Sequence, residues 1–278
     1  MESKALRQSE ARLAARPVQL VLVRANAPLF YSLAAASLLE VGTPLAADRL
    51  LCFFGCDGVF AEWVRREWLP HKLGRAQLIR QYVQTTWPEY DWFAGHEQYR
   101  AMVSDAGGPT ARGATPAHEA LSRCVAAAQG GVFYRSLARW AEDASLREMA
   151  RAMAHEEALS FNHFRALYER QFRAQGFGCT QAWRTALSCV RSARDQQVPR
   201  AFGAISAHCA ANVPFPILDY PEFVRRMGAV IERHGNLGLP ERMLLRTWKR
   251  SAPTVVQRAR KKAQPWFKPV LAPARTAG

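Results

Sequence analysis

The sequence of 278 residues predicts an all-α protein. Alternating runs of β-branched residues, which are typical of strands, are few, and dipeptides typical of β-hairpins are almost absent. Alanine, leucine and arginine dominate, and all three favour helix. Hydrophobic residues make up 49% of the chain and charged residues 22%. Since these are the values of an ordinary globular domain, we expect a helical bundle with a buried core.

The first half of the chain contains three helical patterns. Leu29–Val41 is mostly apolar and is predicted to be a buried helix. The residues Gly42-Thr43-Pro44 stop it, and Leu45–Phe54 continues as a short apolar helix. Asp57 is placed as the N-cap of a helix from residue 58 to about 83, with a joint at Pro70. The aromatic-rich residues 85–99 are expected to cover one end of the bundle.

The second half is organised around residues 117–173, two long amphipathic helices with a break near Trp140–Ser145. Thr115 is the expected N-cap of the first helix, with proline at the first helical position. Either Asp143 or Ser145 is expected to cap the second helix. Further helices are predicted over residues 180–211, interrupted near Pro199, and over Tyr220–His234.

These patterns predict three regions. Residues 1–16 form a polar N-terminal lead, residues 17–248 a single helical-bundle domain, and residues 249–278 a basic, flexible tail. The formal net charge is +15, and residues 242–278 hold ten lysines and arginines without an acidic residue. Such a tail suits an acidic carrier protein or an anionic surface. No nucleic-acid motif accompanies the tail, so we expect no nucleic-acid partner; a homodimer is a further expectation.

The compartment is predicted to be reducing and cytoplasmic. The six cysteines are too few for a disulfide framework in a chain of this length, and Cys52 and Cys56 are expected to be buried thiols on one helix face. Residues 1–16 are charged, unlike a secretory signal. Residues 18–41 are apolar but interrupted by four polar residues or prolines, so we expect no transmembrane segment.

Side chains that bind metals are densest on the second helix of the central hairpin. Glu156, Glu157 and His163 lie there, and positions 156 and 163 are within about 20° of one helix face. Glu67 and His71, four residues apart, share a face of an earlier helix. On the first helix of the hairpin, small residues at 127, 128, 130 and 131 either permit close packing or leave space for a ligand. Tyr134 on that helix could place its hydroxyl at a polar centre.

The central hairpin resembles the ferritin-like superfamily. The resemblance lies in Ala126–Arg139 and Met153–Tyr168, and the layout of Phe60–Val83 is similar to that of soluble acyl-carrier-protein desaturases. It implies a ferritin-like bundle and a di-iron centre, whose ligands come from Glu67, His71, Glu119, Glu156, Glu157 and His163, with Tyr134 as a catalytic residue. The sequence departs from the family pattern because Ser160 occupies an expected histidine position and Ala127 an expected glutamate position.

Three functions remain open. The first is a divergent metal-dependent oxygenase or desaturase acting on a small or lipid-like substrate, of which a haem-oxygenase-like di-iron oxidase is a variant, since such proteins carry a glutamate and a histidine seven apart. The second is a ferritin-like scaffold without metal that binds an apolar ligand, an acyl chain or a protein partner. The third is a structural or interaction protein whose carboxylates are solvated. No phosphate-binding loop or hydrolase triad is present in the sequence.

Overall fold

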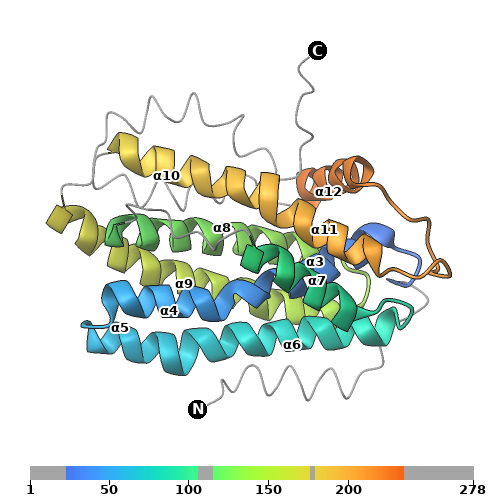
Figure 1. The fold of residues 1–278 in the computed structure, drawn as a ribbon, viewed down its shortest axis with the longest axis horizontal. Coiled ribbons are helices and arrows are strands. Elements are labelled where there is room, and N and C mark those ends of the chain that lie inside the picture. Colours follow the sequence, from blue (N-terminus) through green and yellow to red (C-terminus); the bar gives the residue numbers. More distant parts are fainter. Residues whose placement is uncertain (1–22, 106–114, 176–178, 235–278) are drawn as a thin grey trace. The chain divides into compact units, whose positions relative to one another are not determined.

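The computed structural model describes residues 23–105, 115–175 and 179–234 (Figure 1). Within these ranges every regular element is a helix and none is a strand. The all-α prediction is therefore confirmed. The polar lead over residues 1–16 and the basic tail over residues 249–278 lie outside the described residues.

The described residues group into two compact units, and the single domain over residues 17–248 stays a prediction. Among the described residues, the first unit takes in 23–105, 142–146 and 196–223. The second takes in 115–141, 147–175, 179–195 and 224–234. The two units are described separately below.

The first unit is built on α3 (Ala27–Leu39), which is buried over almost its whole length. Asn26 caps this helix by accepting a hydrogen bond from the Leu29 N–H at 3.1 Å. A 3₁₀ turn (Glu40–Gly42) leads into α4 (Thr43–Phe54). In the described residues no single helix is long and apolar enough to cross a membrane; α3 and α4 together pass that test of length and composition, but they are bent by 41°.

The next helix of the first unit bends where the sequence places a proline. Asp57 caps α5 (Gly58–Trp63) as predicted, accepting from the Phe60 N–H at 3.1 Å. A π-helical turn (Val64–Trp68) then leads into α6 (Leu69–Thr86), with Pro70 at the start of α6. Proline has no N–H and its ring crowds the carbonyl four residues earlier, so a widened turn relieves that contact.

A π-helical turn also precedes Pro199, the second proline that was predicted to interrupt a helix. A π-helical turn (Ala193–Gln197) joins α10 (Cys179–Ser192) to α11 (Val198–Ala207), and Pro199 follows directly. Both prolines therefore mark joints in long helices rather than loops between separate ones.

The core of the first unit forms where α6, α7 (Trp92–Asp105) and α11 contact α3. Figure 1 shows α6 running beside α3 and α4. The aromatic segment before α7 is buried at Trp87 and Tyr90. An isolated antiparallel bridge pairs Tyr90 with Cys209 and fixes this segment to the residues that follow α11.

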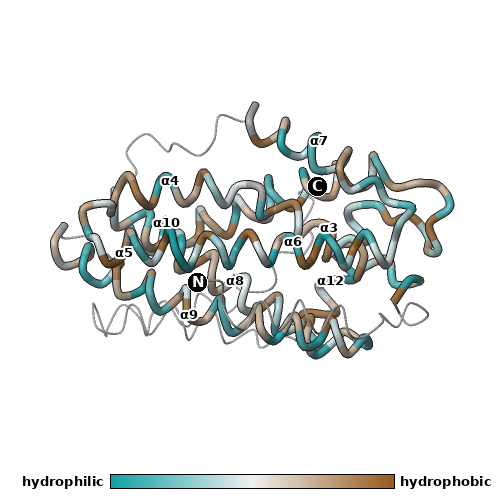
Figure 2. The backbone as a smooth tube through the Cα atoms, turned by 90° about the horizontal axis from the view of Figure 1, so that it is seen from below, coloured by the Kyte–Doolittle hydropathy of each residue, from teal (hydrophilic) through white to brown (hydrophobic). Residues whose placement is uncertain are grey.

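The second unit contains most of the predicted central hairpin. Thr115 caps α8 (Pro116–Trp140), accepting from the His118 N–H, and proline occupies the first helical position as expected. The next helix, α9 (Ala144–Gln175), begins beyond the predicted break. Asp143 is its cap, because the Leu146 N–H donates to Oδ2 at 2.8 Å. The hydropathy of α9 alternates along the tube in Figure 2, as expected for an amphipathic helix.

The remaining helices also follow the sequence pattern. In the second unit α10 packs along α8. The last described helix, α12 (Tyr220–His234), has the predicted bounds. The Arg139 side chain donates to the His234 carbonyl at 2.9 Å and so links α8 to the end of α12.

One prediction about the cysteines is wrong. Cys52 and Cys56 were expected to be buried, but both are exposed. The buried face of α4 is formed by Ala46, Ala47, Leu50 and Phe54. Because Cys52 lies about 200° around the helix from Leu50, it points away from that face.

Candidate functional site

The predicted ligands of the first unit are close together but solvent-accessible. Glu67 is exposed on the π-helical turn, and His71 is partly buried on α6. Burial lowers the pKa of His71, and the nearby Glu67 carboxylate raises it; the net pKa lies below the ordinary value. The prediction that the two side chains share a helix face thus agrees with their electrostatic contact.

The predicted ligands of the second unit differ in burial. Glu119 is 3% exposed and Glu157 2%, whereas Glu156 is partly buried and His163 is exposed. Glu119 forms an ion pair with Arg123, one turn along α8, at 2.7 Å. Of the predicted metal ligands, these two buried carboxylates are the best candidates for a functional site, because burying a carboxylate costs free energy unless other groups stabilise it.

Glu157 lies directly over a glycine of α8. A Cβ atom added to Gly130 would lie 2.8 Å from Glu157 Oε1 and 2.9 Å from its Cδ. At Gly131 an added Cβ would be 3.7 Å from Glu157 Cβ, an ordinary contact distance. Gly130 and Gly131 of α8 therefore make room for a side chain of α9, as the close-packing interpretation expects.

The two buried carboxylates cannot share one metal centre. Positions 119 and 130 are eleven residues apart on α8, which corresponds to about 16 Å along the helix axis. Glu157 lies at the level of Gly130, so its carboxylate is far from that of Glu119 compared with the roughly 3.5–4 Å between the ions of two-metal sites. Among the residues that the structure describes, no three histidine, cysteine, aspartate or glutamate side chains form a group that could hold a metal ion. The role of the six residues as ligands stays a prediction.

Tyr134, the predicted catalytic residue, is 4% exposed on α8, and its ring meets that of Phe133 edge to face. Ser160, at the position where the resemblance implies a histidine, is also buried. A buried tyrosine at this place is consistent with a role in packing, and its catalytic role stays a prediction.

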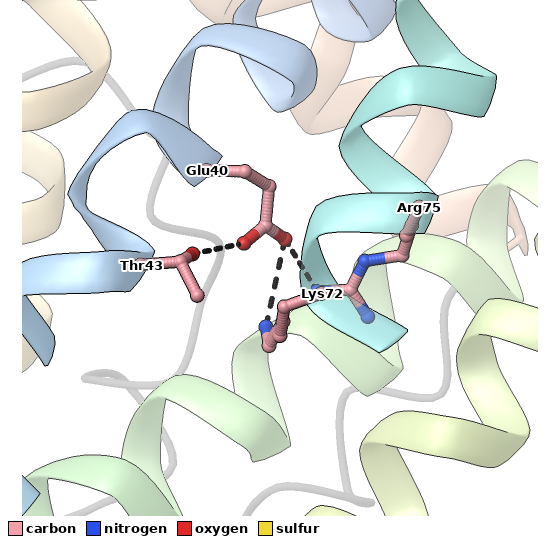
Figure 3. A network of polar contacts seen from close by, with 4 residues as sticks. All are labelled: Glu40, Thr43, Lys72 and Arg75. Carbon is pink, nitrogen blue, oxygen red and sulfur yellow. Dashed lines mark hydrogen bonds and ion pairs between the residues drawn. The ribbon is translucent and has the colours of Figure 1, made fainter. Parts of the chain in front are cut away.

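A buried ion-pair network, which the sequence did not reveal, lies in the first unit (Figure 3). The Glu40 carboxylate pairs with Arg75 and with Lys72, at 3.5 Å for Lys72, and accepts from the Thr43 hydroxyl at 2.8 Å. The Arg75 side chain is 2% exposed and that of Glu40 11%. Burial by itself raises the pKa of Glu40, but the two cations and the hydrogen bonds outweigh it and hold the pKa at about 2. This network ties the start of α4 to α6.

A second feature of the first unit is a group of packed aromatic rings. Phe30 meets Trp87, Tyr90 and Phe215 with ring centroids 5.1 to 5.3 Å apart. Tyr31 stacks on Phe202 at 4.7 Å. Offset and edge-to-face packing at these distances is favourable, and it brings segments from three parts of the sequence together.

Four polar side chains lie near these rings, and we call Tyr31, Tyr90, Ser206 and Cys209 the hydroxyl cluster; the Tyr90 hydroxyl itself lies against Gly95 of α7. Ser206 lies near the Tyr31 hydroxyl, and the Cys209 thiol is close enough to affect the pKa of both tyrosines. The hydroxyl oxygens of Tyr31, Tyr90 and Ser206 are buried, and within the described part of the chain none has a hydrogen bond of normal geometry. Burial and the nearby Glu89 carboxylate raise the pKa of Cys209 to about 11.

Sequence reasoning missed both features for the same reason. Glu40 and Arg75 are 35 residues apart, and Tyr31 and Ser206 are 175 apart. The only sequence signals are a charged residue after an apolar helix and tyrosines inside apolar runs. Neither signal indicates which residue contacts Glu40 or the tyrosines, because those contacts form only in the tertiary structure.

No protein-family model matches the chain, and no curated protein matches it.

Proposed function

We propose that the protein is a helical binding protein that holds a small, mostly apolar molecule at the hydroxyl cluster. The observation that carries the proposal is the burial of three hydroxyl oxygens, on Tyr31, Tyr90 and Ser206, that make no hydrogen bond of regular geometry, although Ser206 and the Leu218 backbone lie near the Tyr31 hydroxyl. This corresponds to the scaffold alternative left open by the sequence, with the site now in the first unit.

Energetics support a ligand with hydrogen-bonding atoms. A buried hydroxyl without a partner costs about 1–3 kcal/mol, and native proteins leave few such groups. Tyr31 is 0% exposed and Tyr90 3%, so bulk water does not offset this cost. A molecule that placed one or two oxygen or nitrogen atoms among the hydroxyls would recover it.

The surrounding side chains define the class of ligand. Phe30, Phe202 and Phe215 pack with the tyrosines of the cluster, so a molecule bound there would contact aromatic rings, while the hydroxyls can donate or accept. Mostly apolar walls with a few converging polar groups are typical of small-molecule sites. A phenol, a quinone or a short carboxylic acid fits this description.

The chemistry of the thiol favours binding over covalent catalysis. With its pKa at about 11, the Cys209 thiol is almost entirely protonated at neutral pH. Because the thiolate is the nucleophile, Cys209 is a poor candidate for attacking a substrate.

A second candidate, the metal-dependent oxidoreductase, is favoured by one specific observation. Glu157 is a buried carboxylate of the second unit, as a carboxylate ligand of a metal would be. If a di-iron centre formed around it, Glu157 would contribute a ligand, Glu119 would lie too far away to share that centre, and iron would supply the activation of oxygen.

One purification tests both candidates. The full chain is expressed in iron-rich medium, analysed by native mass spectrometry, and extracted with organic solvent, and its iron and manganese are quantified. We expect an organic molecule to co-purify with the wild type and to be strongly depleted in a Tyr31→Phe/Tyr90→Phe variant. Tyr99→Phe, a buried tyrosine of α7 outside the cluster, is the matched control and should retain the molecule.

Two results would overturn the binding proposal. One is protein that carries no organic molecule, with or without metal. The other is a molecule whose amount is unchanged when both hydroxyls of the cluster are removed. Metal at about two ions per chain, lost in Glu157→Ala, would establish the second candidate in its place.

A further inference from the structure

Two cysteines lie exposed at the tip formed by the end of α4 and the start of α5. Cys52 is in the last turn of α4, and Cys56 is the second residue after that helix ends. The other cysteines whose burial the structure describes are buried or partly buried. The tip therefore presents two thiols to solvent within five residues of sequence.

Backbone geometry fixes the distance between these two positions. Gly55, the residue after α4, has right-handed helical dihedrals with φ −64° and ψ −20°, so Cys56 follows α4 at close to helical spacing, within the turn that Asp57 closes. Residues four apart on a helix have Cα atoms about 6 Å apart, from the rise of 1.5 Å per residue. The residue after Cys56 is also fixed, because the Asp57 N–H donates to the Phe54 carbonyl at 3.0 Å and the Asp57 side chain caps α5.

This spacing favours a bridging cation over a disulfide. The Cβ atoms of residues four apart on a helix are about 5–6 Å apart, whereas a disulfide requires roughly 3.5–4.5 Å. Two thiolates that bind one cation at about 2.3 Å each need sulfur atoms no more than about 4.6 Å apart. Rotation about the Cα–Cβ bonds changes the separation of the two sulfurs, so thiols at this spacing can reach a shared two-coordinate cation.

We propose that Cys52 and Cys56 form a dithiol site for a soft, two-coordinate cation of the Cu(I) type. Thiolates select such cations, and binding displaces one proton from each thiol. Zn²⁺ requires four ligands, and in the described part of the chain no group of three or more histidine, cysteine, aspartate or glutamate side chains is present to supply them. We therefore expect the site to prefer Cu(I) over Zn²⁺. It is separate from the hydroxyl cluster and does not depend on the proposed function.

Anaerobic titration with Cu(I) against a bicinchoninate competitor tests the site in the full chain. We expect one tightly bound Cu(I) per wild-type chain and at least about 100-fold weaker binding in either Cys52→Ser or Cys56→Ser, since loss of even an outer-shell partner costs up to that much. Cys189→Ser is the matched control: it removes a partly buried thiol elsewhere and should leave the titration unchanged. Circular dichroism of each variant verifies folding.

Three results would overturn the proposal. The first is wild-type binding no tighter than that of the Cys52→Ser/Cys56→Ser double variant. The second is loss of binding in only one of the two single variants, because a dithiol site requires both sulfurs. The third is Zn²⁺ binding at the tip as tight as Cu(I) binding.

Discussion

Replacing Glu40 with glutamine removes the carboxylate that both Arg75 and Lys72 contact, while leaving nearly the same volume. The Arg75 side chain is 2% exposed and that of Lys72 18%, so water replaces the lost interaction poorly. Removing one partner of a buried ion pair costs several kcal/mol, because the charge that remains is desolvated. We therefore expect Glu40→Gln to be strongly destabilising at neutral pH.

The pKa of Glu40 gives the magnitude and the pH window. It falls from the ordinary 4.5 to about 2 in the folded protein. A pKa that is lower by one in the folded than in the unfolded protein corresponds to about 1.4 kcal/mol, so the ionised carboxylate contributes about 3 kcal/mol to the free energy of unfolding. Since the folded pKa is the lower one, this contribution is present in full above about pH 4.5 and is lost as the pH falls toward 2.

Urea unfolding followed by circular dichroism measures the effect. We expect the unfolding free energy of Glu40→Gln to be lower by about 3 kcal/mol at pH 7, and this difference to shrink steadily below pH 4.5. Glu62→Gln is the matched control, because the ion pair of Glu62 with Arg66 has side chains 61% and 76% exposed. That substitution should change stability by less than about 1 kcal/mol.

The reasoning would be refuted if Glu40→Gln and Glu62→Gln behaved alike at pH 7. It would also be refuted if the deficit of Glu40→Gln were the same at pH 7 and pH 3, because the linkage requires it to depend on ionisation of the carboxylate.

Three further substitutions test other parts of the structure. Gly130→Ala should lower the free energy of unfolding by about 1–2 kcal/mol, because its Cβ would displace the buried Glu157 carboxylate, whereas Gly131→Ala should be neutral or stabilising by up to about 1 kcal/mol. Equal urea midpoints for the two variants would contradict the described packing. Asp143→Ala should cost about 2–3 kcal/mol in urea unfolding, because it removes both the α9 cap and the acceptor of the Tyr82 hydroxyl; the exposed α12 cap variant Asp219→Ala should cost only about 1 kcal/mol. Glu67→Gln should lower the pKa of His71 further in an NMR titration, while Glu62→Gln should leave it in place; a His71 pKa that does not move would show that the two side chains are apart in solution.

The helices were largely predictable because their signals are local. Asp57 and Thr115 were identified as caps from sequence, and α12 has the predicted bounds. Pro70 and Pro199 were identified as interruptions, although the sequence did not show that each follows a π-helical turn. Caps, prolines and apolar spacing act within a few residues, so the chain carries them without reference to its fold.

The candidate sites were predictable only in part. The sequence identified Glu119 and Glu157 as carboxylates of interest but could not show that they are about 16 Å apart along α8. It placed Cys52 and Cys56 on one helical face but assigned that face to the core, where the structure exposes it. Which face of a helix is buried depends on the helices that pack against it, and those contacts are not local.

By itself the sequence determined the helical class, most helix boundaries and the residues from which any site must be made. The tertiary structure alone decided which of those residues meet. It placed Glu40 against Arg75 and Lys72, the Glu157 carboxylate over Gly130, and the Tyr31 hydroxyl near Ser206. The physical reason is that helix formation depends on hydrogen bonds and spacing within a few residues, whereas burial, pKa and ligand contacts depend on groups brought together across the whole chain.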